Sequence, residues 1–229
     1  MNGKQLKNSI LQWAIQGKLV PQDPNDEPAS VLLERIRAEK ARLVKEGKIK
    51  KDKNESIIFR GDDNSYYEKF LATGEVKCID DEIPFEIPEG WAWERWGNIS
   101  LSIQYGHNAP AIERGDIKMV RISDIHDNVV QWSTVPFCKI DTHEIDTYLL
   151  KENDILFART GGTVGKSFLV QSIPEPAIYA GYLIRTRYSQ ELCPQYLKSF
   201  MERPLYWEQL KSGTFATAQP NCICKTLGR

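Results

Sequence analysis

The chain lacks any long run of uncharged apolar residues among its 229 residues. A membrane helix needs roughly 20 such residues, and the N-terminal stretch MNGKQLKNSI also lacks the apolar core of a secretory signal. Cysteine is scarce, with five residues in no repeated spacing, which argues against a disulfide framework. We therefore expect a cytoplasmic protein without a membrane span.

Net charge is also scarce, because 30 Lys and Arg residues against 31 Asp and Glu residues give −1. The charges are placed unevenly: residues 1–60 carry +5 (13 basic, 8 acidic), residues 61–154 carry −11 (8 and 19) and residues 155–229 carry +5 (9 and 4). Chance clustering is one explanation. The other is a polarised molecule whose basic C-terminal third faces phosphate without a general basic field.

Two helices are expected near the N-terminus. Apolar residues recur at helical spacing and predict an amphipathic helix over about residues 3–16, which Gly17 stops. A second helix is expected from about residues 26–28 to residue 46, with Gly47 just past its end. Its apolar stripe is narrow and flanked by charges, which is typical of a helix that lies along another helix or along a domain.

Residues 48–82 are polar and rich in charge, and we interpret them as a linker with one short ordered turn around Tyr66–Leu71. For the basic run Lys48–Lys53, a solvated tether is favoured over a nucleic-acid contact. The chain then divides into an N-terminal helical segment (1–50), a linker (51–83) and a folded domain (84–229).

Short β-rich runs alternate with turns beyond residue 83. A helical segment follows at Pro194–Leu210, and Pro204 breaks it into two pieces. Strands followed by helices predict an α+β fold, a single domain with a mixed β core and C-terminal helices, preceded by the two N-terminal helices. The predicted strands lie within IKMVRISDI (117–125), VVQWSTVPF (129–137), DILFAR (154–159), SFLV (167–170) and IYAGYLIRTR (178–187).

The segment ARTGGTVGKS (158–167) approaches a Walker A loop without matching it. That loop needs a glycine five residues before Gly165, where this chain has Thr160. A nucleotide-binding enzyme also needs a helix after the loop, and SFLVQSIPEPAIY is typical of strand and turn. A tight turn between strands is therefore favoured. With Arg159 and Lys166 at its edges it offers cations and N–H groups to DNA, the alternative being an ordinary hairpin connection.

A second unusual stretch is GTFATAQPNCICKT (213–226), which is rich in small and polar residues. Gln219 and Asn221 are side chains that can pair bidentately with adenine, and Lys225 can reach guanine or phosphate. Polar loops are common, so this signal is weak by itself.

The sequence contains no recognisable catalytic constellation. The three histidines are scattered among acidic residues, and His126 with Asp127 is expected in a hairpin turn at the surface. Cys222 and Cys224 lack a second ligand pair for a metal. Hydrolase, zinc-peptidase and adenine-methylation signatures are missing. We expect a chain that is no enzyme and holds no cofactor or metal.

Four stretches together resemble the specificity subunits of type I restriction–modification systems. Residues 11–43 are similar to a segment at the edge of a target-recognition domain, and IPEGWAWERWGNI (87–99) to the opening of that domain. LLKENDILFARTGGTVGKSFLV (149–170) is similar to its central signature. The two stretches YAGYLIRTR (179–187) and GTFATAQPNCICKTL (213–227) together are similar to the closing part of that domain. The resemblance covers nearly the whole chain.

The resemblance implies a subunit with two recognition domains, each reading one half of a bipartite sequence in double-stranded DNA. Long helices between the domains form an antiparallel coiled coil that holds two methyltransferase subunits. S-adenosylmethionine and ATP belong to the methyltransferase and restriction subunits. This sequence stops where the C-terminal helix and second domain are expected. We therefore expect a fragment, a truncated product or a half-subunit that self-associates with a second copy.

The closing motif departs from the family pattern at Cys222–Cys224, where the family more often places a polar residue in the middle. We expect sequence-specific DNA recognition within a type I complex, the alternative being a protein-interaction fragment without DNA binding. The loops Tyr105–Asn108 and Arg121–Asp124 are second-rank candidates. The candidate DNA-binding residues are Arg159, Thr160, Gly161, Gly162, Lys166, Gln219, Asn221, Lys225, Tyr105 and Arg121.

Overall fold

The computed structural model describes residues 2–213 and confirms both N-terminal helices. Helix α1 (Gly3–Ile15) begins at Asn2, whose side chain accepts a hydrogen bond from the Gln5 N–H, while the Gln5 side chain accepts one from the Asn2 N–H. These two bonds satisfy N–H groups that a helix start leaves unpaired. After the helix, Gly17 takes the left-handed conformation (φ 66°) that favours glycine.

Helix α2 (Ala29–Lys45) lies on the surface, as its narrow apolar stripe predicts. Ile36 and Lys40 are buried, and the other residues of the helix are half-buried or exposed. The Lys40 ammonium donates to the carbonyl oxygens of Gly97 and Asn98 at 3.0 and 2.9 Å. Burial lowers the pKa of Lys40, and these two acceptors replace the water that the ammonium has lost. A buried charge therefore ties α2 to the start of the main domain.

The segment interpreted as a linker with one short ordered turn forms instead a small antiparallel sheet of order β1-β2-β3. Neighbouring residues in a strand point to opposite faces, so Glu68 is buried while the adjacent Lys69 is exposed. The high charge content of this segment therefore led to a linker prediction, although the segment contains a strand whose buried charge is paired. The strands are β1 (Ser56–Arg60), β2 (Tyr66–Phe70) and β3 (Val76–Cys78).

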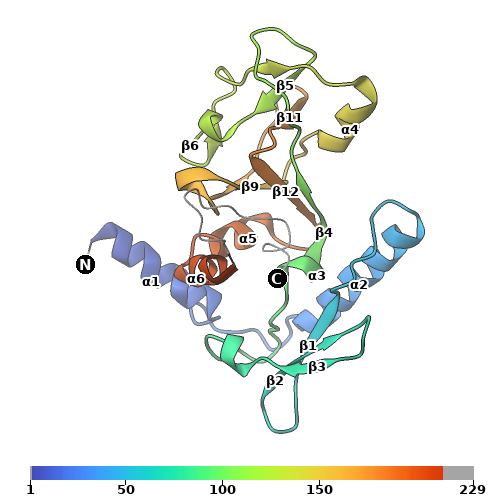
Figure 1. The fold of residues 1–229 in the computed structure, drawn as a ribbon. Coiled ribbons are helices and arrows are strands. Elements are labelled where there is room, and N and C mark those ends of the chain that lie inside the picture. Colours follow the sequence, from blue (N-terminus) through green and yellow to red (C-terminus); the bar gives the residue numbers. More distant parts are fainter. Residues whose placement is uncertain (1, 214–229) are drawn as a thin grey trace.

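A four-stranded antiparallel sheet of order β10-β9-β12-β4 forms the centre of the molecule. Helices α5 and α6 cover one of its faces, where Tyr206 and Leu210 share a core with Phe157 and Ile184. Figure 1 shows these helices between the central sheet and the small sheet β1–β3. Pro204 separates the two helices, as predicted. The bounds are α3 (Trp96–Ile99), β4 (Ser100–Tyr105), β9 (Ile155–Ala158), β10 (Ser167–Leu169), β12 (Leu183–Tyr188), α5 (Pro194–Phe200) and α6 (Pro204–Gly213).

A second sheet of order β11-β5-β8 packs on the other side of the central sheet. Val120, Leu156, Tyr179 and Leu183 are fully buried in the core between the two sheets. Strand β11 runs parallel to β5 and β8 antiparallel to it, which confirms the predicted α+β fold with a mixed β core. The bounds are β5 (Ile117–Val120), β6 (Ile125–His126), β7 (Val129–Val130), β8 (Phe137–Cys138), α4 (Ile145–Tyr148), β11 (Ala177–Tyr179) and the 3-10 turns Asp80–Glu82, Ile122–Asp124, Thr142–Glu144 and Gly161–Thr163.

A buried arginine fastens the segment around α4 to the central sheet. Arg185 on β12 is 1% exposed and donates to the carbonyl oxygens of Leu149 and Thr147 and to the Gln104 side chain, at 2.8, 3.0 and 2.6 Å. Its guanidinium also lies 4.9 Å from the centre of the Tyr179 ring. Burial lowers the pKa of Arg185. The partners compensate for the lost hydration of the buried charge, so Arg185 serves the fold.

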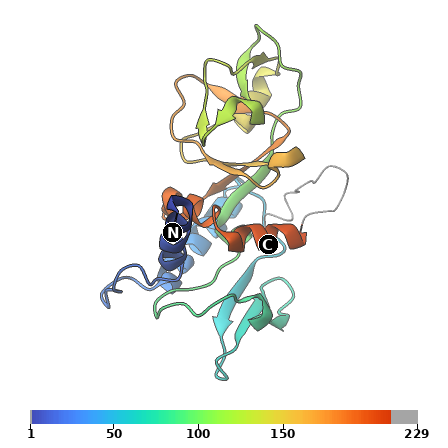
Figure 2. The same cartoon turned by 90° about the vertical axis from the view of Figure 1, so that its left-hand side faces the viewer.

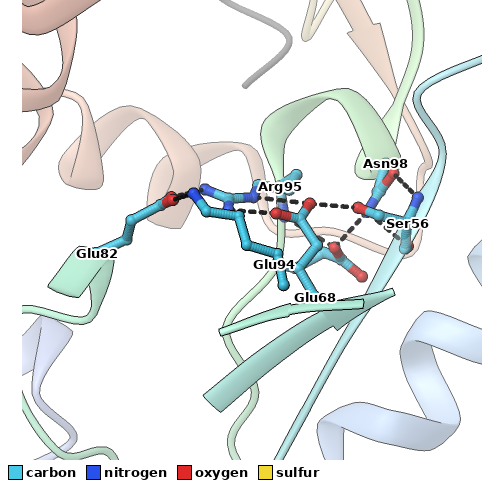
Figure 3. A network of polar contacts seen from close by, with 7 residues as sticks. Ser56, Glu68, Glu82, Glu94, Arg95 and Asn98 are labelled. Carbon is cyan, nitrogen blue, oxygen red and sulfur yellow. Dashed lines mark hydrogen bonds and ion pairs between the residues drawn. The ribbon is translucent and has the colours of Figure 1, made fainter. Parts of the chain in front are cut away.

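A buried polar network joins the small sheet to α3 (Figure 3). Arg95 donates to both carboxylate oxygens of Glu68, at 3.1 and 2.5 Å, and pairs with Glu82 at 2.8 Å. Burial acts to raise the pKa of Glu68, but hydrogen bonds from Arg95 and Ser56 outweigh it and leave the pKa lowered. Asn98 on α3 donates to the Ser56 carbonyl oxygen at 2.9 Å. The ion pair therefore holds two parts of the chain together.

Helix α1 docks at the junction of α5 and α6. The Arg203 side chain, 1% exposed, donates to the Asn8 carbonyl oxygen at 3.1 Å. Lys7 and Glu202 add an ion pair at 3.1 Å. In Figure 2, α1 and α6 both lie at the level between the small sheet and the two larger sheets. Among the helices in the described part of the chain, none combines the length and apolar character needed to cross a membrane.

Replacing Arg95 with methionine is expected to lower the free energy of unfolding by about 3 kcal/mol, because the Glu68 carboxylate is left buried without its cation. The measurement is urea unfolding at pH 7. The matched control is Arg42→Met, which removes an exposed ion pair with Glu46 and is expected to leave the free energy of unfolding almost unchanged. Equal losses for both variants would contradict the structural role of the buried pair.

Candidate nucleic-acid interface

Three connecting segments meet at one end of the central sheet. These are residues 105–108 at the end of β4, the β11–β12 turn (180–182) and the β9–β10 loop (159–166). The His107 N–H donates to the Tyr179 carbonyl oxygen at 2.9 Å, and the Gly181 N–H donates to the His107 carbonyl oxygen at 2.8 Å. The Arg159 N–H donates to the Tyr182 carbonyl oxygen at 2.9 Å. Backbone hydrogen bonds thus join two segments that sequence analysis proposed separately, 105–108 and 159–166, to the β11–β12 turn.

Gly106 makes this convergence possible. A Cβ at this position would lie 2.3 Å from the Ala180 carbonyl oxygen and 2.4 Å from that of Tyr179. Such distances are far inside van der Waals contact, and the obstructing atoms belong to the backbone. A side chain at residue 106 would therefore push the loop after β4 away from the β11–β12 turn.

Arg159 is held in a defined orientation by two neighbouring loops. Its guanidinium lies 4.5 Å from the centre of the Tyr105 ring, a separation at which cation and ring attract each other. Its Nη1 donates to the Gly181 carbonyl oxygen at 3.5 Å. Within residues 2–213, its buried Nε finds no acceptor. Two sequence candidates are therefore brought together, and the geometry gives Tyr105 the role of a support beneath Arg159.

The glycine-rich loop forms a tight turn between β9 and β10, as predicted. Gly161 and Gly165 have φ values of 79° and 82°, which strain any residue other than glycine. The Tyr206 hydroxyl of α6 donates to the Gly165 carbonyl oxygen at 2.6 Å. Strand β10 follows the loop, whereas phosphate binding by a Walker A loop uses the N-terminus of a following helix. The turn therefore lacks the geometry of a nucleotide site.

Lys166 is exposed at the edge of a groove of about 360 Å³. The β6–β7 hairpin forms one wall of this groove, with Asp127 and Asn128 at its tip. Both residues have left-handed backbone (φ 48° and 63°), so the hairpin turn predicted at His126–Asp127 is confirmed. Lys198 of α5 lines the opposite side, and its ammonium pairs with Glu202 at 3.0 Å. Lys166 is thus an exposed cation at a groove that also contains the carboxylates of Asp127 and Glu202.

Arg121 lies beside the same β11–β12 turn, because the Ala180 N–H donates to the carbonyl oxygen of the preceding residue, Val120. Its side chain is engaged elsewhere, since it donates to both carboxylate oxygens of the buried Asp124 at 3.0 and 2.8 Å. The hydrogen bonds that Arg121 donates to the Asp124 carboxylate raise the pKa of Arg121. The Arg121 side chain therefore stabilises the turn that contains Asp124. The other candidates, Thr160, Gly161 and Gly162, lie on the same loop as Arg159.

Three of the seven Lys and Arg residues described in the C-terminal third are buried or paired with a buried carboxylate. Arg185 and Arg203 are each 1% exposed, and Arg187 pairs with the buried Asp154 at 3.1 Å. The prediction that this third presents a basic surface to phosphate is therefore wrong for these three arginines. The described cations left for such a surface are few, and Arg159 and Lys166 are the ones at the converging loops.

Other predicted site residues cannot be placed. Gln219, Asn221 and Lys225 lie outside the described residues, as do Cys222 and Cys224. Within residues 2–213, no three His, Cys, Asp or Glu side chains gather as a metal would require. Sequence reasoning missed Tyr182, which is 62% exposed in the β11–β12 turn. The glycine before it signals a turn, but its exposure depends on the tertiary structure.

In the comparison with known proteins, the relatives are specificity subunits of type I restriction enzymes. The chain is 34% identical over 230 residues to the type I restriction enzyme EcoEI specificity subunit of Escherichia coli, a match that covers 94% of this chain and 35% of that protein. It is 41% identical over 155 residues to the EcoAI specificity subunit of Escherichia coli, covering 67% and 23%. The chain thus spans about a quarter to a third of the length of these relatives.

The chain was also compared with solved structures and with family models. A chain from a solved structure on complex assembly and conformational transition of the type I R-M system has 18% identity and a TM-score of 0.48, with 64% of this chain and 34% of that chain covered. No family model matches the chain.

Replacing Gly106 with alanine is expected to lower the free energy of unfolding by about 2 kcal/mol, since the added methyl group has no space between two backbone segments. Thermal or urea unfolding measures this loss. Gly162→Ala is the control, because a Cβ at residue 162 meets no atom within 4 Å, and a change within about 0.5 kcal/mol is expected. A neutral Gly106→Ala variant would show that the close approach is not required.

Proposed function

We propose that this chain, which is homologous to the specificity subunits of type I restriction enzymes, recognises a specific sequence of duplex DNA. The alignment with one relative covers 94% of this chain, so all three converging loops lie within the aligned part. We propose a role in recognition without catalysis, in the cytoplasm. The partners would be methyltransferase and restriction subunits, and a second copy of the chain is a further candidate.

The convergence of the three loops around Arg159 is the observation that carries this proposal. A DNA-reading surface needs cations for phosphate and rigid donors for base edges. Lys166 is exposed, and an ammonium group on the long stem of a lysine suits a phosphate contact. Arg159 is stacked on Tyr105, and a pre-oriented guanidinium suits the two acceptors of guanine in the major groove. We place the reading surface at these loops and keep the division into residues 1–50 and 84–229 as part of the proposal.

Arg159→Ala and Lys166→Ala are expected to affect DNA binding differently. Loss of Arg159 is expected to cost about 1–3 kcal/mol at one base pair and to relax the sequence preference there. Loss of Lys166 is expected to weaken binding to all sequences and to reduce the slope of log K against log salt by about 1. Fluorescence titrations with target and scrambled duplexes at several salt concentrations measure both effects, using the chain co-assembled with its methyltransferase subunit.

Lys51→Ala serves as the control, because the basic run around it is interpreted as a solvated tether, and it is expected to leave the slope unchanged. Equal binding of target and scrambled duplexes by the unmodified complex would reject sequence-specific recognition. Assembly with the partner without any DNA binding would favour the alternative, a protein-interaction fragment.

Gln219 and Asn221 remain proposed base-contacting residues. Replacing both with alanine in the assembled complex is expected to broaden the set of methylated sequences, because each amide that pairs bidentately with adenine contributes about 1–3 kcal/mol of discrimination. Sequencing of the methylated sites measures the change. An unaltered recognition sequence would remove these two residues from the reading surface.

A further inference from the structure

Tyr182 projects into solvent from the turn between β11 and β12. Its exposed fraction of 62% is the largest among the aromatic residues that the structure describes, whereas Tyr179 three residues earlier is fully buried. Single exposed apolar side chains are normal on protein surfaces. Exposure alone therefore assigns no role to this ring, and a role has to be inferred from the residues around it.

The backbone that carries Tyr182 is fixed on both sides. The Tyr182 carbonyl oxygen accepts a hydrogen bond from the Arg159 N–H at 2.9 Å. Within the turn, the Leu183 N–H donates to the Ala180 carbonyl oxygen at 2.8 Å, and the Gly181 N–H donates to the loop after β4 at 2.8 Å. A tyrosine has only two side-chain torsions, so a ring on so rigid a base loses little entropy when it is buried by a ligand.

The ring stands next to the best-oriented cation of the interface. Tyr182 lies opposite Arg159, one position beyond the ladder pair Leu183–Ala158. The Arg159 side chain donates to the carbonyl oxygen of Gly181, the residue before Tyr182. A guanidinium and an exposed aromatic ring therefore leave the surface from adjacent positions. DNA that approaches Arg159 closely enough for a base contact also covers Tyr182.

The chemistry of the ring selects one group on the edge of a base pair. In the major groove, the bases offer hydrogen-bond donors and acceptors, and thymine alone adds an apolar methyl group. An aromatic carbon surface gains free energy by covering that methyl group and gains none by covering an unpaired polar atom. We propose that Tyr182 contacts a thymine methyl group next to the base read by Arg159, an inference that rests on the proposed function.

The test is a cycle between protein and DNA variants. The unmodified complex with its methyltransferase subunit and the Tyr182→Ala complex are given target duplexes in which each thymine is replaced in turn by uracil, which lacks only the methyl group. Methylation rates at subsaturating DNA are measured. At one thymine, uracil is expected to slow the unmodified complex about fourfold, the factor for one buried methyl group, and to leave Tyr182→Ala unaffected. Tyr182→Phe is expected to keep the sensitivity to uracil.

Tyr196→Ala is the matched control, since it removes another exposed tyrosine, on α5, and is expected to leave every thymine-to-uracil ratio unchanged. If uracil slows the unmodified complex at no thymine, or slows Tyr182→Ala equally, Tyr182 does not read a methyl group. Neither result touches the proposed function. That function fails on a different observation, which is methylation by the unmodified complex without any preferred sequence.

Discussion

The end of the molecule at which we propose DNA recognition depends on a backbone contact that admits no side chain. At Gly106, the chain leaving β4 passes so close to the β11–β12 turn that a Cβ would lie 2.3 Å from the Ala180 carbonyl oxygen. The hydrogen bonds on either side of this contact join the central sheet to the sheet β11-β5-β8. Arg159 and Tyr182 are positioned by the same turn. The contact therefore links the fold of the two sheets to the geometry of the proposed interface.

Several charged side chains of this chain lie inside the molecule and do not contribute to its surface. Arg185 and Arg203 are buried, and Glu68 is paired with Arg95 under the small sheet. Charges in such positions stabilise tertiary contacts and add little to the surface potential. A DNA-binding surface on this scaffold consequently relies on a few oriented groups, and its affinity depends less on a general basic field.

Local patterns were sufficient to predict the helices α1, α2, α5 and α6, the break at Pro204 and the turn between β9 and β10. Each is set by residues adjacent in sequence, such as Gly17 after α1. The small sheet was not predictable in this way, because Glu68 is stabilised by Arg95, which lies 27 residues away. The role of Tyr105 as a support for Arg159 and the exposure of Tyr182 also arise from loops that meet only in the folded chain. Candidate residues could be named from motifs, but their division into contacts and supports could not.

The central claim is that this chain selects a DNA sequence for partner subunits to modify. Co-expression with a methyltransferase subunit, followed by single-molecule mapping of modified adenines, tests it most directly. The account predicts modified adenines within one defined sequence shared by all modified sites. Modification scattered over sites without a shared sequence, or none despite a stable complex between the two chains, would contradict it.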